Sequence, residues 1–288
     1  MQVFKFGGSI LKDAGSIKKL GELLKSYEQE DLAIVVSAMG KTTNALEGVL
    51  DSYLSSDGLA TEKFAAVKAY HQTVAADLFA EDDAIWVDLS DLLVEVEWIL
   101  EDDVHDERPY LYDQIVCLGE LLSSCIVAAY LNAEGLPVKW HDARGLLITD
   151  DHFTQAAVDL AASARRVADA RAESEWLLTQ GFIGGTIDNN STTLGREGSD
   201  YSAALLTYFL DADALTLWKD VDGIYTGDPK LADPVERLEQ LSYDEALAII
   251  DAGAKVIHRK ALHLLKEQKI PLRVRPFADW GDEGSLIG

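Results

Sequence analysis

Two patterns of hydrophobic and polar residues alternate along the chain. Residues 2–6 and 31–38 are short, nearly continuous apolar runs of strand length, which is typical of buried parallel strands. Between them, residues 13–27 carry apolar side chains at helical spacing on one face. The chain therefore opens with a predicted β-α-β unit.

The rest of the chain continues this alternation. Long helical patterns are predicted at residues 42–104, 112–134, 159–180, 243–253 and 256–269. Strands are predicted at residues 137–143, 181–185, 214–219 and 270–277. Strands that alternate with helices favour a mostly parallel central sheet covered on both faces, a three-layer αβα sandwich. We expect a single α/β domain with two lobes.

The charge balance excludes several classes of function. Among 288 residues, 50 are acidic and 25 are basic, which gives a formal net charge of −25. A nucleic-acid groove or a polybasic membrane surface is not expected from such a chain. An anionic substrate would have to be held by locally gathered cations and backbone amides. A high-salt environment is an alternative explanation of the acidic excess.

The cysteines and the hydrophobic runs indicate the compartment. Cys117 and Cys125 are eight residues apart, which is neither a redox-pair nor a zinc spacing, so we expect free thiols in a reducing cytoplasm. No signal-peptide pattern opens the chain, and no run of 18 uninterrupted apolar residues occurs. A soluble cytoplasmic protein is expected.

Glycine-rich segments follow several predicted strands. They are KFGGS (5–9), SAMGKTTN (37–44), GFIGG (181–185), LGREGSD (194–200) and WKDVDGIYTGDPK (218–230). Ligands of open α/β sheets bind at the carboxyl ends of the strands. Gly7 and Gly8 could simply shape a turn, but they could also bring backbone N–H groups to an anion at the start of the next helix, with Lys5 adding a positive charge.

Common phosphate-binding motifs are absent from the sequence. The GKT at residues 40–42 lacks the first glycine of a P-loop, because position 35 is valine. The dinucleotide fingerprint GxGxxG does not follow the first strand, and the HRD and DFG signatures of protein kinases do not occur. A nucleotide would need a different phosphate cradle.

The ordered set of KFGGS, VVSAMGKTTN, LGREGSDYSAA, WKDVDGIYTGDPK and GAKVIH (253–258) resembles the aspartokinases, which have the amino-acid kinase fold. The resemblance covers essentially the whole chain. It implies transfer of a phosphoryl group from MgATP to the β-carboxylate of L-aspartate, a first step in lysine, threonine and methionine biosynthesis. It also implies an N-terminal amino-acid lobe (about 1–185) and a C-terminal nucleotide lobe (about 186–288).

The resemblance assigns roles to residues of this sequence. Lys5 and Asp200 are the expected catalytic pair, although Asp200 could also be a plain helix N-cap. The expected substrate-binding residues are Ser37, Thr43, Glu120, Arg196 and Ser199. The expected nucleotide-binding residues are Gly7, Gly8, Ser9, Lys219, Asp220, Tyr225, Lys230 and Lys255. Mg²⁺ is expected to be held mainly by the ATP phosphates, near Asp200, and no firm protein ligand is assigned.

The sequence departs from the family pattern at three of these motifs. Glu197 replaces a small residue, Arg259 stands where proline is common, and Lys219 replaces a threonine. The chain ends at Gly288, where many aspartokinases continue into regulatory domains, so none is expected within it. A homodimer through the kinase domain is a further expectation.

Two alternatives remain open. The same fold could act on acetylglutamate, glutamate, carbamate or UMP, or it could be a silent amino-acid or nucleotide sensor. Glu120 and Arg196 together favour an acceptor with a free ammonium and a free α-carboxylate.

Overall fold

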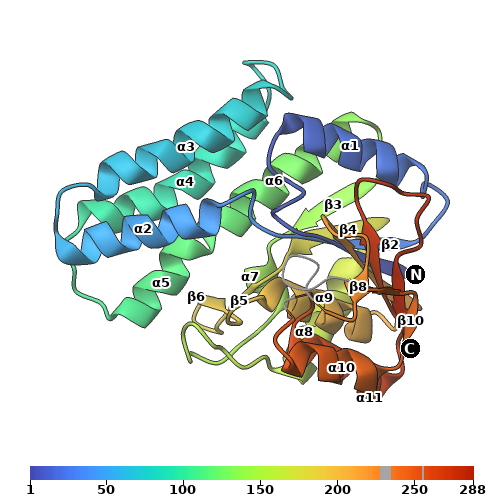
Figure 1. The fold of residues 1–288 in the computed structure, drawn as a ribbon. Helices are drawn as coiled ribbons and strands as arrows, with labels where there is room; N and C mark the ends of the chain where they lie inside the picture. Colours follow the sequence, from blue (N-terminus) through green and yellow to red (C-terminus); the bar gives the residue numbers. More distant parts are fainter. Residues whose placement is uncertain (228–234, 255) are drawn as a thin grey trace.

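Residues 1–227, 235–254 and 256–288 are described in a computed structural model of the protein (Figure 1). Within them the main sheet has eight strands in the order β10-β12-β11-β7-β1-β2-β4-β3. Their bounds are β1 Gln2–Phe6, β2 Leu32–Val36, β3 Val138–His141, β4 Trp176–Gln180, β7 Ala214–Lys219, β10 Gln240–Leu241, β11 Leu272–Pro276 and β12 Ser285–Ile287. All neighbours pair in parallel except β11 and β12. The carboxyl ends of β1, β2, β4, β7 and β11 therefore share one edge.

Side chains alternate between the two faces of the sheet, because successive residues of a strand point in opposite directions. In β1, Phe4 and Phe6 enter one hydrophobic cluster, whereas Val3 enters the other. Lys5 has the same parity as Val3. The face that receives Val3 and Lys5 is covered by α8 to α11, and the opposite face by α1 and α6.

The helices form the two outer layers. Their bounds are α1 Ala14–Lys25, α2 Thr42–Ser55, α3 Ala60–Ala76, α4 Ile85–Glu101, α5 Arg108–Val116, α6 Leu118–Ala133, α7 Ala143–Leu146, α8 Leu160–Ala172, α9 Gly198–Phe209, α10 Tyr243–Asp251 and α11 Arg259–Gln268. Helices α2 to α5 form a group beside the sheet, at the left of Figure 1. The structure confirms the predicted three-layer αβα arrangement with a mostly parallel sheet.

One predicted helix is wrong in its second half. The pattern at residues 159–180 separates into α8 and strand β4, with Glu173 as the C-cap of the helix. Trp176 and Leu178 enter one hydrophobic cluster and Leu177 enters the other. A strand buried on both faces is a continuous apolar run, which periodicity alone does not distinguish from a buried helix.

The segment GFIGG is a strand, but it does not join the main sheet. Strand β5 (Ile183–Gly185) pairs antiparallel with β6 (Ser191–Thr193) in a separate hairpin. A Cβ on Gly184 or Gly185 would lie 2.6 or 2.5 Å from a carbonyl oxygen in or beside α7. The glycines therefore let this hairpin pack closely on α7. Strands β8 (Ile224–Tyr225) and β9 (Arg237–Leu238) form another small hairpin.

Helices α5 and α6 form one helical stretch, Arg108–Ala133, with the length and composition of a membrane span. Within the described residues, 78% of its most apolar window is buried inside the fold. Packing against the sheet and the neighbouring helices accounts for its apolar character.

Candidate active site

Two lysines and one aspartate meet at the carboxyl edge of the sheet. Lys5 on β1 places its Nζ 2.9 Å from Oδ1 of Asp200, which is the third residue of α9. Lys219, the last residue of β7, places its Nζ 3.2 Å from Oδ2 of the same carboxylate. The side chains of Lys5 and Asp200 are 9% and 6% exposed. The sequence-predicted residues Lys5, Asp200 and Lys219 thus form one compact ionic cluster.

The electrostatics of this cluster favour an anion. Burial raises the pKa of the Asp200 carboxyl, but the charges of Lys5 and Lys219 outweigh burial and hold that pKa at about 2. Burial lowers the pKa of Lys5, and the charge of Asp200 opposes this effect. Asp200 therefore stays ionised at neutral pH, and two ammonium groups share one carboxylate. The surplus positive charge is available to a ligand.

The aspartate does not act as a helix cap. Glu197 occupies the N-cap position of α9 and makes no side-chain capping bond. Asp200 lies three residues further on and directs its carboxylate to the two lysines. The alternative reading of Asp200 as an N-cap is therefore wrong.

The two glycine turns next to Lys5 are interlocked. The amide of Gly40, a residue with φ +54°, donates to the carbonyl of Gly8 at 3.0 Å. A Cβ on Gly8 would collide with the carbonyl oxygen of Ala38, whereas one on Gly7 would lie 3.5 Å from Lys5 Nζ. The close approach of backbones at Gly8 is why this position requires glycine.

The pattern at residues 13–27 correctly predicts helix α1, which begins at Ala14. The start of the helix therefore lies five residues beyond the exposed Ser9 and not beside the glycines. Its N-cap Asp13 accepts from the backbone N–H of Ser16 at 2.7 Å in a capping box. The N-terminus of α1 is thus capped by its own chain and does not present those amides to a ligand.

A buried carboxylate lies beside the end of β2. Glu120, the third residue of α6, is 3% exposed, and its Oε2 has no hydrogen-bond partner among the described residues. Burial raises its pKa to about 8, and the backbone N–H groups of Glu120 and Ala38 oppose this only in part. Since a buried carboxylate without a partner is costly, this group is suited to receive a cationic ligand group.

The half-buried Ser37 and Thr43 belong to the same region. Ser37 follows β2, and Thr43 lies in the first turn of α2. A Cβ on Gly119, the neighbour of Glu120, would contact Ala38 and Thr42 at 3.2 and 3.0 Å. The end of β2, the start of α2 and the start of α6 are therefore packed together.

Arg196 lies on the turn that joins β6 to α9, and Ser199 is the second residue of α9. Arg196 is exposed, and the following Glu197 has φ 58° and ψ 19°, a left-handed conformation that favours glycine. A Cβ on Gly181 would lie 2.6 Å from the Cβ of Ser199. The end of β4 is thereby brought against the start of α9.

Sequence reasoning missed Phe182 as a residue of this region. Phe182 has φ +71°, is 7% exposed, and its ring lies against Gly198. A bulky residue in the left-handed region is uncommon and often marks a functional position. The sequence GFIGG does not reveal the left-handed conformation of Phe182, because the same residues are compatible with an extended strand.

Two of the remaining predicted nucleotide-binding residues, Asp220 and Tyr225, lie in the segment that follows β7. Asp220 is exposed directly after β7, and the hydroxyl of Tyr225 donates to both carboxylate oxygens of Asp222 at 2.9 Å. Lys230 and Lys255 lie outside the described residues. Among the residues that the structure describes, three or more His, Cys, Asp and Glu side chains do not gather as metal ligands.

Gly7 and Gly8 provide a matched test of the turn that follows β1. We expect Gly8→Ala to lower the free energy of unfolding by about 1–3 kcal/mol, since overpacking forces the Ala38 backbone to move. Gly7→Ala should change it by less than about 1 kcal/mol, because its methyl group meets only the flexible end of Lys5. Urea unfolding of both variants measures the difference. Equal destabilisation would contradict the account of the turn.

The raised pKa of Glu120 predicts a pH-dependent stability of the free protein. Between about pH 4.5 and 8, the Glu120 carboxyl is protonated in the folded protein and ionised in the unfolded chain. The contribution of Glu120 to stability is therefore full below about pH 4.5 and is lost as the pH rises to 8. Glu120→Gln, which imitates the protonated form, should match the parent at pH 5. At pH 8.5 it should be more stable by roughly 2–4 kcal/mol. A constant difference across this range, measured by thermal unfolding, would argue against a buried, unpartnered carboxylate.

Comparisons with known proteins identify the family of the chain. The model of the amino acid kinase family matches residues 1–276. The chain is 31% identical to lysine-sensitive aspartokinase 3 of Escherichia coli over 99% of its own length and 63% of the relative's. It is 30% identical to the aspartokinase of Chlamydia trachomatis, over 99% of this chain and 64% of that protein. The chain thus spans less than two thirds of these relatives.

Solved structures extend the comparison. The structure of E. coli aspartokinase III in complex with aspartate and ADP has a TM-score of 0.91 and 30% identity, covering 100% of this chain and 64% of that one. Uridylate kinase from Archaeoglobus fulgidus has a TM-score of 0.57 and 17% identity over 99% of its chain, which is a likeness of fold alone. The chain belongs to the amino acid kinase family.

Proposed function

We propose that this protein transfers a phosphoryl group from ATP to the β-carboxylate of L-aspartate, producing β-aspartyl phosphate and ADP. The observation that carries the proposal is the pair of features at one sheet edge: a lysine-rich cluster with surplus positive charge, and a buried carboxylate with one oxygen unpartnered among the described residues. The first suits anions, and the second suits an ammonium group. Similarity to an aspartokinase structure with aspartate and ADP supports the same assignment.

The chemistry requires charge neutralisation and alignment more than a general base. The β-carboxylate of aspartate is ionised at neutral pH, so its oxygen can attack the γ-phosphorus directly while the bond to the ADP oxygen breaks. Lys5 would stabilise the charge on the transferring phosphoryl group, and the Gly7–Gly8 turn lies beside its Nζ. Asp200 holds Lys5 and Lys219 in place as positioned cations.

Recognition of the amino acid would divide between two groups. Glu120 would accept the α-ammonium, and that charge would lower its raised pKa on binding. Arg196 would bind the α-carboxylate as a bidentate fork. Ser37, Thr43 and Ser199 border the same region. We place the amino-acid subsite in residues 1–185 together with the Arg196 turn, and the nucleotide subsite at Lys219, Asp220, Tyr225, Lys230 and Lys255.

Magnesium would arrive as the counterion of the nucleotide. The one carboxylate of the lysine cluster, Asp200, is already shared by two ammonium groups, so the described residues fit a metal held chiefly by phosphate oxygens. When bound, the ion would neutralise phosphate charge. An ATP-dependent reaction of this kind fits a cytoplasmic location.

Three of the other acceptors of the family are less compatible with the site. N-acetylglutamate has no ammonium group, so it would leave Glu120 buried without a partner. UMP and carbamate would do the same. A silent sensor would not need Lys5 and Lys219 directed at one carboxylate.

Purified protein should therefore form aspartyl hydroxamate when L-aspartate, MgATP and hydroxylamine are present. Parallel reactions with N-acetyl-L-glutamate, carbamate and UMP, measured by the release of ADP, should proceed far more slowly. A KCl series up to molar concentration tests whether the acidic surface reflects a high-salt environment. Hydroxamate from N-acetylglutamate but not from aspartate would overturn the assignment.

Lys5→Met removes the ammonium group but keeps most of the buried side-chain stem. We expect turnover with L-aspartate to fall by about 10²- to 10³-fold, because one positioned charge-stabilising group is lost. Lys18→Met, at an exposed position of helix α1, serves as a control for removal of a lysine. Nearly normal turnover of Lys5→Met would refute its role.

A further inference from the structure

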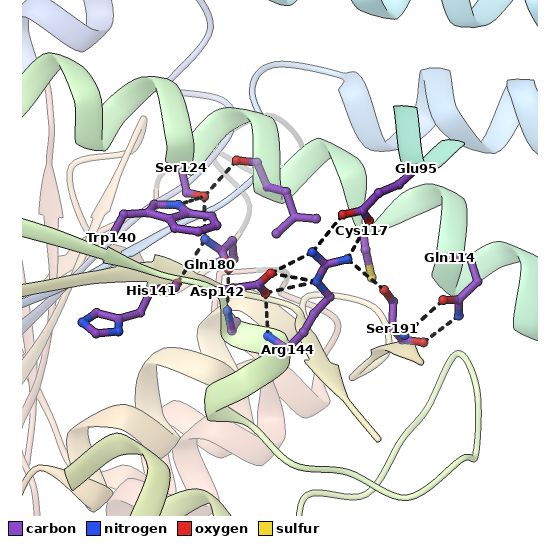
Figure 2. Close-up of polar contacts among 12 residues, drawn as sticks. Glu95, Gln114, Cys117, Ser124, Trp140, His141, Asp142, Arg144, Gln180 and Ser191 are labelled. Carbon is purple, nitrogen blue, oxygen red and sulfur yellow. Dashed lines mark hydrogen bonds and ion pairs between the residues drawn. The ribbon is translucent and has the colours of Figure 1, made fainter. Parts of the chain in front are cut away.

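Helix α5 lies along the strand edge of β6 that β5 does not use. Gln114 donates through Nε2 to the carbonyl of Ser191 at 2.9 Å and accepts from the amide of Ser191 at 3.0 Å. Asp113 accepts from the amide of Thr193 at 2.9 Å and from its hydroxyl at 2.7 Å. Side chains of α5 thus replace a neighbouring strand for β6. Figure 2 shows the two Gln114 bonds to Ser191.

Asp113 also holds a second segment that borders the Arg196 turn. Its Oδ2 accepts from the amide of Thr154 at 2.9 Å. Thr154 has φ +71°, an uncommon conformation for a β-branched residue, and its carbonyl oxygen would lie 3.6 Å from a Cβ on Gly195. The carboxylate of Asp113 is fully buried, and both of its oxygens accept hydrogen bonds. It therefore fixes both the strand before the Arg196 turn and the loop packed behind it.

Additional contacts support the start of β6. Arg144 forms an ion pair with Glu95 of α4 at 2.7 Å and with Asp142 at 2.7 Å. Its Nη1 also donates to the Ser191 hydroxyl at 3.4 Å (Figure 2). Ser191 is thus held from α5 and from the segment at α7.

The same helical stretch carries Glu120. Helix α5 ends at Val116, Cys117 joins it to α6, and the amide of Leu121 donates to the carbonyl of Cys117. Glu120 follows Asp113 by seven residues, close to two helical turns or about 10 Å of rise. One helical stretch therefore bears Glu120 near its middle and, about two turns earlier, contacts the strand leading to Arg196.

We propose that Asp113 and Gln114 are positioning residues that set the placement of Arg196 relative to Glu120, and so determine recognition of an α-amino acid by its two charged groups. This inference rests on the proposed function, in which Glu120 and Arg196 bind the amino acid. In this proposal the two α5 residues act through β6 and not by contact with the substrate. Small errors in the spacing of two charged groups weaken binding of a ligand whose ammonium and carboxylate are a fixed distance apart.

The decisive variants are Asp113→Ala and Asp113→Asn. The alanine removes all three bonds. The asparagine can keep them, because its amide oxygen accepts from the two backbone N–H groups and its NH₂ group donates to the Thr193 hydroxyl oxygen. We expect Asp113→Ala to raise KM for L-aspartate at least tenfold while KM for ATP changes by less than twofold. Asp113→Asn should stay within about threefold of the parent in both constants.

Ile115→Ala is the matched control for lost stability. Ile115 is fully buried on the same helix, and its side chain belongs to the hydrophobic cluster rather than the β6 contacts. Gln114→Ala, at a half-buried position, provides a second test if Asp113→Ala does not fold, and a threefold or larger rise in KM for L-aspartate is expected. Equal changes of KM in Ile115→Ala and Asp113→Ala would overturn the proposal.

A double-mutant cycle separates positioning from general damage. In an Arg196→Ala background, Asp113→Ala should change KM for L-aspartate by less than twofold, because the residue that it positions is gone. An additive, tenfold effect in that background would contradict the proposal.

Hydrogen exchange gives a readout that does not depend on the reaction. Exchange of the peptide covering residues 191–198 should increase in Asp113→Ala and remain near the parent in Asp113→Asn and Ile115→Ala. Unchanged exchange in Asp113→Ala would disprove the positioning role of Asp113, even if the phosphoryl acceptor proved to be a compound other than aspartate. Failure of the proposed function would appear separately, as absent aspartyl hydroxamate with the parent protein.

Discussion

The buried ionic cluster of Lys5, Asp200 and Lys219 is the interaction on which the rest of the site depends. Burying three charges is costly unless they are paired with good geometry, and here one carboxylate serves two ammonium groups. The cluster arises because β1 and β7 are neighbours in the sheet, with Lys5 opposite Leu217 and Lys219 two residues further on. Both lysines therefore project to the face covered by α9. A chain of net charge −25 thus concentrates positive charge at one edge.

The two buried carboxylates of the site illustrate opposite environments. Asp200 is held ionised by lysines, with a pKa of about 2, whereas Glu120 is held in a poorly solvated position with a pKa of about 8. Asp200 holds two cations that can bind anionic groups, whereas one oxygen of Glu120, unpartnered among the described residues, can bind a cation. In the proposed reaction, phosphate and carboxylate would approach the lysines while an ammonium group would point towards α6.

Much of this arrangement could be predicted from the sequence. The apolar runs of β1 and β2, the glycine turns and Lys5 are local features, and the order of the motifs was sufficient to indicate the family. Strand β4 was mistaken for the end of a helix because a strand buried on both faces lacks alternation. The contacts of Asp113 depend on tertiary packing between segments about 40 to 80 residues apart. The left-handed Phe182 packs on the start of α9, where its amide donates to the hydroxyl of Ser202. Such contacts leave no periodic signal in a single sequence.

The most direct test of the account is a crystal structure of the protein with L-aspartate and a non-hydrolysable MgATP analogue. The account predicts that the Lys5 ammonium lies between the β-carboxylate and the γ-phosphoryl group, with the α-ammonium at Glu120. A nucleotide or amino acid bound at another face of the sheet, with the Lys5–Asp200 pair away from both, would contradict it.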